Sequence, residues 1–205
     1  MEPRDNYAIQ AMQAKQRFLT YDQQELIQKL KLLPEGDYLC LQMLGRPYRI
    51  HRTTGSVEKW QKDAWVDGNS YGEVMTLLDL VCDSRPDRYL SCRWKNMQDF
   101  GLMFHRTLLE QKKDPIAEAF QADPEGFLKA CMALGGKPLS MGDIAFAIEL
   151  FDGLCIAVQL WFGDDEFPPN LRILWDENAL MYLKYETMYF AKSLLLQQIL
   201  EEMRA

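Results

Sequence analysis

The longest apolar pattern in the chain spans Asp143–Phe162, where two apolar runs flank Asp152-Gly153. An Asp-Gly pair between two such runs is typical of a two-residue hairpin turn, in which both residues take positive φ. In the register that this turn predicts, Glu149 faces Ile156, and both faces of the hairpin are almost entirely apolar. Because such a hairpin must be covered on both sides, we expect it to form the core.

A second alternating pattern predicts an antiparallel meander of three strands. The predicted strands are residues 38–44, 48–51 and 57–60, with turn residues between them. In the middle strand, Tyr48 and Ile50 lie on one face, and Arg49 and His51 lie on the other. The meander is therefore expected to have one polar face.

Apolar residues at helical spacing predict helices before, between and after these strands. The first 33 residues are predicted to be helical, with Asp22 and Glu25 at capping-box spacing. Further helices are expected from Ser70 to about Cys82, from Pro115, from Pro124 and from Glu186 to Met203. Leu171–Trp175 is predicted to be a short strand, and no element is predicted for residues 84–115.

These elements predict a single α+β domain over residues 1–205. Residues 1–37 are expected to be N-terminal helices, residues 38–185 an α+β core, and residues 186–205 a C-terminal helix. Antiparallel meanders and the hairpin form the core sheet, and the N-terminal, central and C-terminal helices pack on it.

The net charge of −7 narrows the range of partners. An acidic chain is repelled by phosphate backbones and by anionic membrane surfaces, so neither nucleic acid nor membrane is an expected partner. The N-terminus has no apolar stretch of the kind found in signal peptides, and no run of residues is long and apolar enough to span a bilayer. The expected location is the cytoplasm.

The five cysteines are scattered along the chain. They are Cys40, Cys82, Cys92, Cys131 and Cys155, and no two have C-x-x-C spacing. An odd number without a paired spacing suggests neither a disulfide framework nor a zinc site. We therefore expect reduced thiols with a structural role.

Three sequence patterns that resemble catalytic or ligand-binding motifs do not support an enzyme. Gly68–Gly72 matches G-x-S-x-G, but Ser70 precedes a helix and has Glu73 at the capping-box position, so we interpret Ser70 as a helix cap. Gly135–Pro138 lacks the first glycine of a phosphate loop and has proline at the magnesium-binding position. The two histidines, His51 and His105, lack a ligand partner at motif spacing. No catalytic residue and no metal ligand are predicted, and no cofactor is identified.

Four carboxylates lie at the open end of the predicted hairpin: Asp143, Asp164, Asp165 and Glu166. Crowding of this kind raises the pKa of carboxyl groups, or calls for a cation or an arginine. A solvated acidic loop, in which one carboxylate caps a turn, is the competing interpretation.

Arg46 and Arg49 form part of a basic edge on the predicted meander. Such an edge can hold an anion, or can discourage strand-to-strand aggregation. If both meanders join in one sheet, these arginines can pair with the acidic loop. The residues predicted to bind a ligand are therefore Arg46, Arg49, Asp143, Asp164, Asp165 and Glu166.

Five segments carry a family resemblance. They are Leu44-Gly45-Arg46-Pro47-Tyr48-Arg49-Ile50, Leu90-Ser91-Cys92-Arg93-Trp94, Ala133-Leu134-Gly135-Gly136-Lys137-Pro138-Leu139, Gly142-Asp143 and Gly163-Asp164-Asp165-Glu166-Phe167-Pro168-Pro169. In this order they resemble the prokaryotic domain-of-unknown-function 3786 family, from about Tyr38 to Tyr189. The resemblance implies proteins of anaerobes without an assigned activity. Some relatives carry a cysteine-rich iron–sulfur segment like those attached to corrinoid proteins, which this chain lacks.

These observations favour a non-enzymatic accessory or ligand-binding module. The family association implies a link to corrinoid or one-carbon metabolism, and the partner is an unidentified small molecule or protein. The alternatives are an acid-loop enzyme that uses a metal or a carboxylate base, and a homo-oligomeric interaction protein. A binding module should have a largely apolar cleft, whereas an enzyme should have polar groups that converge near residues 143 and 164–166.

Overall fold

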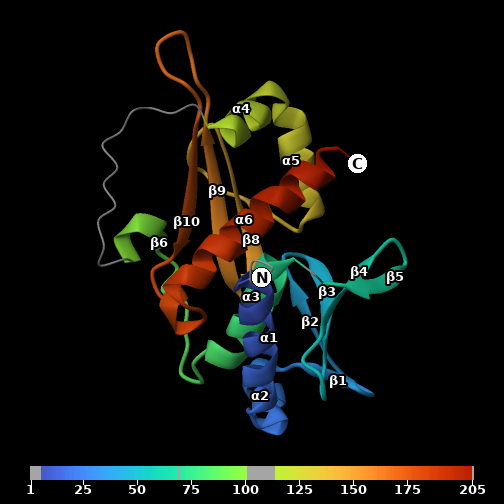
Figure 1. Cartoon of the computed structure of the whole chain (residues 1–205). Coiled ribbons are helices and arrows are strands. Elements are labelled where there is room, and N and C mark those ends of the chain that lie inside the picture. The colour runs from blue at the N-terminus through green and yellow to red at the C-terminus, as the bar shows by residue number, and fades with distance from the viewer. Residues whose placement is uncertain (1–5, 69, 101–113, 205) are drawn as a thin grey trace. The chain divides into compact units, whose positions relative to one another are not determined.

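The computed structural model describes residues 6–68, 70–100 and 114–204 (Figure 1). His105 lies outside the described residues. The chain divides into two compact units. One contains Met1–Tyr89 and Leu180–Ala191, and the other contains Leu90–Ala179 and Lys192–Ala205. In the described part of the chain, no helix is long and apolar enough to cross a bilayer.

The first unit combines an antiparallel sheet with helices. Its elements are α1 (Asn6–Leu19), α2 (Gln23–Leu30), β1 (Leu33–Glu35), β2 (Tyr38–Met43), β3 (Arg46–His51), β4 (Val57–Gln61), β5 (Ala64–Asp67), α3 (Tyr71–Asp83) and the first part of α6 (Tyr185–Glu202). Within the described residues the sheet has five strands, in the order β1-β2-β3-β4-β5.

The expected three-stranded meander is therefore wrong in extent, because β1 and β5 extend it at both edges. The N-terminal helical region also ends earlier than predicted, at Leu30, since Leu33–Glu35 is a strand. Both added strands are short and largely exposed. Strands of this kind lack the apolar alternation by which a half-buried strand is recognised in sequence. Pro34 is tolerated in β1 because this is an edge strand.

A buried carboxylate joins the sheet of the first unit to α3. The Glu73 side chain is 3% exposed, and one of its oxygens accepts hydrogen bonds from the Tyr48 hydroxyl (3.1 Å) and the Lys59 ammonium (2.7 Å). Its other oxygen accepts from the Ser70 hydroxyl (3.0 Å), whose oxygen in turn accepts from the backbone N–H of Glu73 (3.2 Å). Ser70 is thus the N-cap of α3, and the structure confirms the cap interpretation.

The second unit contains a second antiparallel sheet. Its elements are β6 (Trp94–Asn96), the 3₁₀ turn η1 (Met97–Phe100), α4 (Pro115–Ala122), α5 (Pro124–Ala133), β7 (Lys137–Pro138), β8 (Ile144–Phe151), β9 (Leu154–Trp161), β10 (Asn170–Asp176) and the last part of α6; the 3₁₀ turn η2 (Ala179–Met181) follows β10. In the described residues the strand order is β6-β10-β9-β8-β7. Both α4 and α5 begin with the predicted prolines.

The hairpin turn is as predicted, but the register of the hairpin is not. Asp152 and Gly153 have φ of 50° and 81°, as a turn of this type requires. Beyond the turn, Glu149 pairs with Cys155 rather than with Ile156. An irregularity between Glu149 and Phe151 inserts one extra residue into β8, which shifts all later pairs by one position. A bulge of this kind leaves both apolar runs intact, so the pattern of residues did not reveal it.

The apolar hairpin is the core of the second unit. Ile148, Ile156 and Val158 have no exposed surface, and both faces of β8 and β9 are largely buried. Helix α4 contacts β9 and β10, and α5 contacts β8. The rings of Phe120 and Phe127 stack with centroids 4.3 Å apart and join the two helices.

The α+β class and the antiparallel strands are confirmed. The meander and the hairpin nevertheless belong to separate sheets in the described chain, so the assumption that they join in one sheet is wrong. The division into residues 1–37, 38–185 and 186–205 stays a prediction.

Ile148→Asp is expected to unfold the second unit. The substitution places a charge without a partner between two covered faces, which costs several kcal/mol. Urea denaturation followed by circular dichroism measures the loss. Glu149→Gln, at the exposed neighbouring position, serves as the control and should change stability by no more than about 0.5 kcal/mol. Near wild-type stability of Ile148→Asp would show that the hairpin is not central.

Candidate functional site

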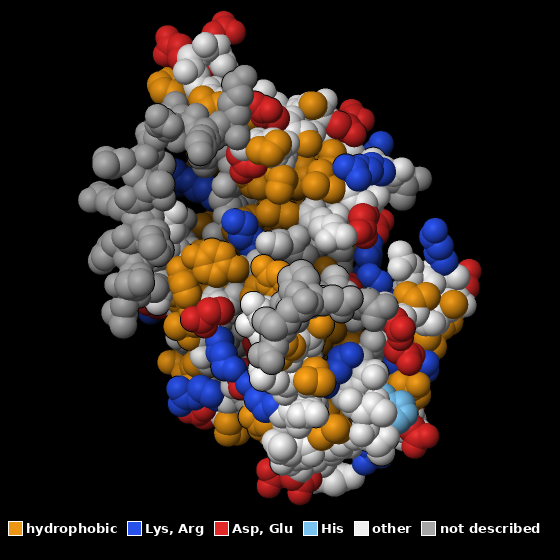
Figure 2. All heavy atoms as spheres, in the orientation of Figure 1, with side chains coloured by type: hydrophobic (Ala, Val, Ile, Leu, Met, Phe, Trp, Pro, Cys, Tyr) orange, Lys and Arg blue, Asp and Glu red, His pale blue; other side chains and the backbone are white. Residues whose placement is uncertain are grey.

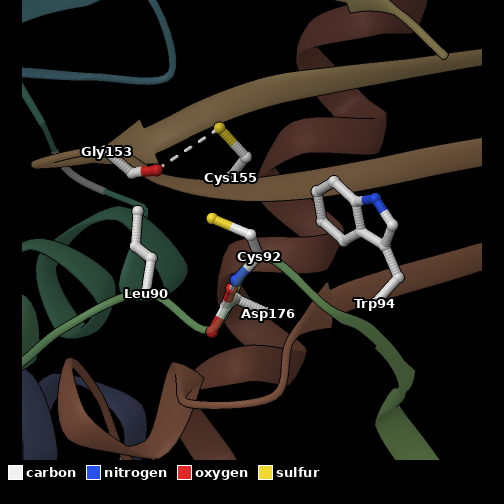
Figure 3. A pocket seen from close by; sticks show the side chains of 6 residues that line it. All are labelled: Leu90, Cys92, Trp94, Gly153, Cys155 and Asp176. Atoms are coloured by element: carbon white, nitrogen blue, oxygen red, sulfur yellow. Dashed lines mark hydrogen bonds between the residues drawn. The ribbon is translucent and has the colours of Figure 1, made fainter.

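A hollow lies at one end of the sheet in the second unit (Figure 3). Its volume is about 260 Å³. The lining residues come from the segment that leads into β6, from the hairpin turn and from three strands: Leu90, Cys92, Trp94, Gly153, Cys155 and Asp176. The lining is mainly apolar and includes two thiols and one carboxylate, and we regard this hollow as the candidate site.

Strand register explains why these residues meet. Trp94 of β6 pairs with Asp176 of β10. On the other side of β10, Trp175 pairs with Ile156, so the next position along the antiparallel pair brings Asp176 beside Cys155. Residues opposite each other in a ladder point to the same face of the sheet. Three neighbouring strands therefore present Trp94, Asp176 and Cys155 in one row.

The Asp176 carboxylate organises the segment that leads into β6. Asp176 is 5% exposed, and its Oδ1 accepts hydrogen bonds from the Ser91 backbone N–H (3.0 Å), the Ser91 hydroxyl (3.1 Å) and the Asn178 N–H (2.8 Å). Its Oδ2 accepts from the Cys92 N–H (2.7 Å). Four donors compensate for burying the charge. Because its oxygens are engaged in this way, Asp176 acts as a positioning group in the wall of the hollow.

Cys92 has an unusual backbone conformation. Its φ is 58°, in the left-handed region, which L-residues with a side chain seldom adopt. A backbone conformation of this kind costs about 1–3 kcal/mol of conformational free energy, and residues that adopt it cluster at functional sites. The hydrogen bond from its N–H to Asp176 holds this conformation. Figure 3 shows Cys92 in the wall of the hollow, between Leu90 and Trp94. Cys92 is exposed, whereas Cys82 and Cys131 are buried.

Cys155 is the more protected thiol of the hollow. Its Sγ donates a hydrogen bond to the Gly153 carbonyl oxygen over 3.5 Å. Burial raises the pKa of the Cys155 thiol, and the nearby Glu149 carboxylate raises it further. A raised thiol pKa favours the protonated form at neutral pH. The two thiols of the hollow therefore differ, one exposed and one half-buried.

The hollow differs from the sites of common structural metals. Within residues 6–68, 70–100 and 114–204, no group of three or more His, Cys, Asp or Glu side chains is arranged to hold a metal ion. Structural zinc and iron–sulfur centres usually use four such ligands.

The structure places the predicted arginines in the sheet of the first unit. Arg49 donates from Nε to a Glu58 carboxylate oxygen at 2.7 Å. Its guanidinium lies 3.9 Å from the Tyr38 ring centroid and 4.3 Å from that of Trp65. Arg46 begins β3 and pairs in register with Met43. Arg49 is thus engaged with side chains on neighbouring strands, and its predicted role in ligand binding stays a prediction.

The predicted carboxylates lie in the second unit, at the end of the β8–β9 pair. Asp143 accepts a hydrogen bond from the Phe162 N–H at 2.7 Å. Asp164 accepts from the N–H groups of Glu166 (2.9 Å) and Phe167 (2.8 Å). Acidic and hydrophobic side chains lie together at the tip of the β9–β10 loop, at the top of Figure 2.

Hydrogen bonds from the backbone determine the pKa of one acid of this loop. Crowding is expected to raise the pKa of the acids or to call for a cation or an arginine, but at Asp164 the backbone N–H donors of Phe167 and Glu166 lower the pKa. A carboxylate that accepts backbone hydrogen bonds stays charged to lower pH. This geometry is that of a turn-capping carboxylate, and the predicted binding role of Asp143, Asp164, Asp165 and Glu166 stays a prediction.

Sequence reasoning missed the residues of the hollow. Leu90–Trp94 lies in the part of the chain for which no element was predicted, although it is one of the segments that carry the family resemblance. Cys155 lies within the predicted core hairpin, and Asp176 directly follows the predicted strand Leu171–Trp175. A signal was available in Cys92, which has polar residues on both sides, whereas each of the other cysteines has at least one apolar neighbour.

Asp176→Ala is expected to destabilise the protein by roughly 3 kcal/mol, because it removes the buried acceptor of four part-buried hydrogen bonds. Chemical denaturation measures the loss. Asp165→Asn, which changes an exposed acid of the same unit, should stay within about 0.5 kcal/mol of the wild type. If the two variants are equally stable, Asp176 does not organise the hollow.

The cysteines are expected to differ strongly in alkylation rate. Burial raises the pKa of Cys82 to about 11 and that of Cys131 to about 12. Because the thiolate is the nucleophile, these two should react with iodoacetamide last, and exposed Cys92 should react first. Peptide mass spectrometry after timed quenching gives the order. Fast labelling of Cys131 in the folded protein would contradict this assignment.

Comparison with known proteins identifies a family. A search of curated proteins and a search of solved structures each gave no match. A family described as "Domain of unknown function (DUF3786)" matches residues 22–198. This match extends beyond the region in which the sequence resemblance was noted, at both ends. Because the match covers most of the 205 residues, the chain belongs to the DUF3786 family of uncharacterised domains.

Proposed function

We propose that this protein is a binding module that takes a small, largely apolar ligand in the hollow between Cys92 and Cys155. The proposal is carried by one observation. A space of about 260 Å³ with a mainly apolar lining has a fixed polar group, Asp176, in its wall. Ligand sites typically combine an apolar lining with a few placed polar groups.

The volume of the hollow limits the ligand. An apolar cavity of about 150 Å³ holds benzene, and pockets for drug-sized ligands occupy roughly 300–1,000 Å³. A space between these sizes fits a compound with one or two rings. A complete corrinoid is far larger, so the predicted link to corrinoid or one-carbon metabolism would require a different mode of contact.

The rigid frame of the hollow supports binding. Trp94 provides an aromatic wall, and its strand is paired with β10. Asp176 holds Cys92 through a 2.7 Å hydrogen bond. A site that is already formed does not lose side-chain and loop entropy when the ligand enters, and this loss is a main cost of binding.

The two alternatives have less support. The acid-loop enzyme requires free carboxylates, whereas Asp143 and Asp164 each accept hydrogen bonds from backbone N–H groups. The interaction protein is favoured by three exposed aromatic residues at the end of β9 and in the loop after it: Trp161, Phe162 and Phe167. Sedimentation of Phe167→Ser and of the wild type distinguishes a homo-oligomer held by this loop from a monomer.

Binding is tested by protection of a thiol in the wall of the hollow. With the reduced protein, indole or benzyl alcohol should slow the alkylation of Cys92 by N-ethylmaleimide several-fold and in a saturable way. An occupant of the hollow covers the Cys92 side chain that lines it. Peptide mass spectrometry measures the rate at each cysteine.

Cys40 provides the matched control, because it belongs to the other unit and is also partly exposed. Its alkylation rate should not change. Cys155→Phe, which fills the hollow, should abolish protection, and a thermal unfolding curve checks that this variant is folded. Chemical shifts of the Leu90 methyl groups give an independent measurement in the wild type. If neither compound protects Cys92 or shifts these resonances, the proposal is wrong.

A further inference from the structure

We propose that Cys92 and Cys155 form a thiol–disulfide exchange site, in which a small organic disulfide oxidises the pair to an intramolecular disulfide. The site shares the hollow of the proposed ligand but does not require a ligand to be bound. Cys92 is the residue that attacks, and Cys155 is the residue that resolves.

Both cysteines are neighbours of the same fixed group. Cys155 lies beside Asp176 in the register of β9 and β10, and adjacent strands are roughly 4.8 Å apart. Cys92 donates its N–H to Asp176 at 2.7 Å. In Figure 3 the Cys155 sulfur is turned toward the Gly153 carbonyl and the Cys92 sulfur lies on the side nearer to Leu90, and both residues line the hollow. Residues that are 63 positions apart in the chain thus line one small space.

The environment favours a neutral product over a bound metal ion. Two thiolates with a monovalent soft metal ion would keep a net negative charge beside the buried Asp176 carboxylate. Like charges in apolar surroundings repel strongly. A disulfide carries no charge and has no polar hydrogen to satisfy. The same two side chains therefore fit a disulfide better than a metal ion.

The difference in solvent exposure between the two thiols indicates which of them reacts first. Cys92 is exposed, so a dissolved disulfide can reach its sulfur. Cys155 is half-buried, and burial raises the pKa of its thiol, so it reacts more slowly with a dissolved disulfide than exposed Cys92 does. Attack by a thiolate through a mixed disulfide is the general route of such exchange.

The exchange proceeds in two steps. The Cys92 thiolate attacks one sulfur of the small disulfide, forms a mixed disulfide and expels the first small thiolate, which takes up a proton from water. Cys155 then loses its proton and attacks the Cys92 sulfur. The second small thiolate leaves and takes up that proton. In total, two protein thiols are oxidised, and one small disulfide is reduced to two thiols.

The test treats the reduced full-length protein with 2-hydroxyethyl disulfide, followed by intact mass measurement and peptide mapping. The wild type should lose two hydrogen atoms and yield one linked peptide that contains Cys92 and Cys155. Cys155→Ser should instead retain one 2-mercaptoethanol group on Cys92. Cys92→Ser should give neither product, and Cys40→Ser should behave like the wild type.

Two results would overturn the proposal. One is a wild type that stops at the mixed disulfide on Cys92, as Cys155→Ser does. The other is a linked peptide that joins different cysteines. Thermal unfolding of each variant confirms that the folded protein is being compared. Because binding of indole is measured on the reduced wild type, failure of the exchange leaves that result intact, and the two proposals fail separately.

Discussion

A buried carboxylate at the end of β10 holds the segment before β6 in place. Asp176 accepts four hydrogen bonds, three of which come from Ser91 and Cys92. This segment has no regular structure of its own before Trp94, so its conformation is set by these bonds. A buried acceptor and its donors must be satisfied together, since each group that is left unpaired costs about 1–3 kcal/mol.

In the first unit, two buried carboxylates join neighbouring elements in the same way. Glu73 joins β3 and β4 to the start of α3, and Asp79 joins α1, α3 and α6. Asp79 is 3% exposed and accepts a 2.6 Å hydrogen bond from the Thr187 hydroxyl in addition to its ion pair with Arg17. In both units, therefore, an acid buried at an element terminus or on a helix fixes how neighbouring elements meet. These acids are structural, unlike the acids of the exposed loop.

The side chains around the Asp176 carboxylate determine the chemistry of the hollow. Cys92, Trp94 and Cys155 are its neighbours in space. Cys92 and Trp94 come from the segment around the start of β6, and Cys155 comes from β9. The carboxylate holds Cys92 in a left-handed conformation and keeps negative charge close to both thiols. This arrangement favours neutral occupants, whether an apolar ligand or a disulfide. It also explains why the candidate site differs from the charged residues that the sequence pointed to.

The sequence by itself determined the elements whose signals are local. The Asp152-Gly153 turn, the Ser70 cap and the helix starts at Pro115 and Pro124 are each specified by residues within a few positions. The α+β class follows from the same patterns. These features were predicted correctly because turn and cap preferences arise from backbone geometry and nearby hydrogen bonds.

Only the tertiary structure decided the register, the sheet edges and the site. One extra residue in β8 changes every later pair, and the exposed strands β1 and β5 have no apolar alternation to reveal them. The site depends on Asp176 meeting Ser91, which lies 85 residues earlier in the chain. No local pattern encodes such a contact, because its free energy arises from burial that exists only once the strands between them have paired.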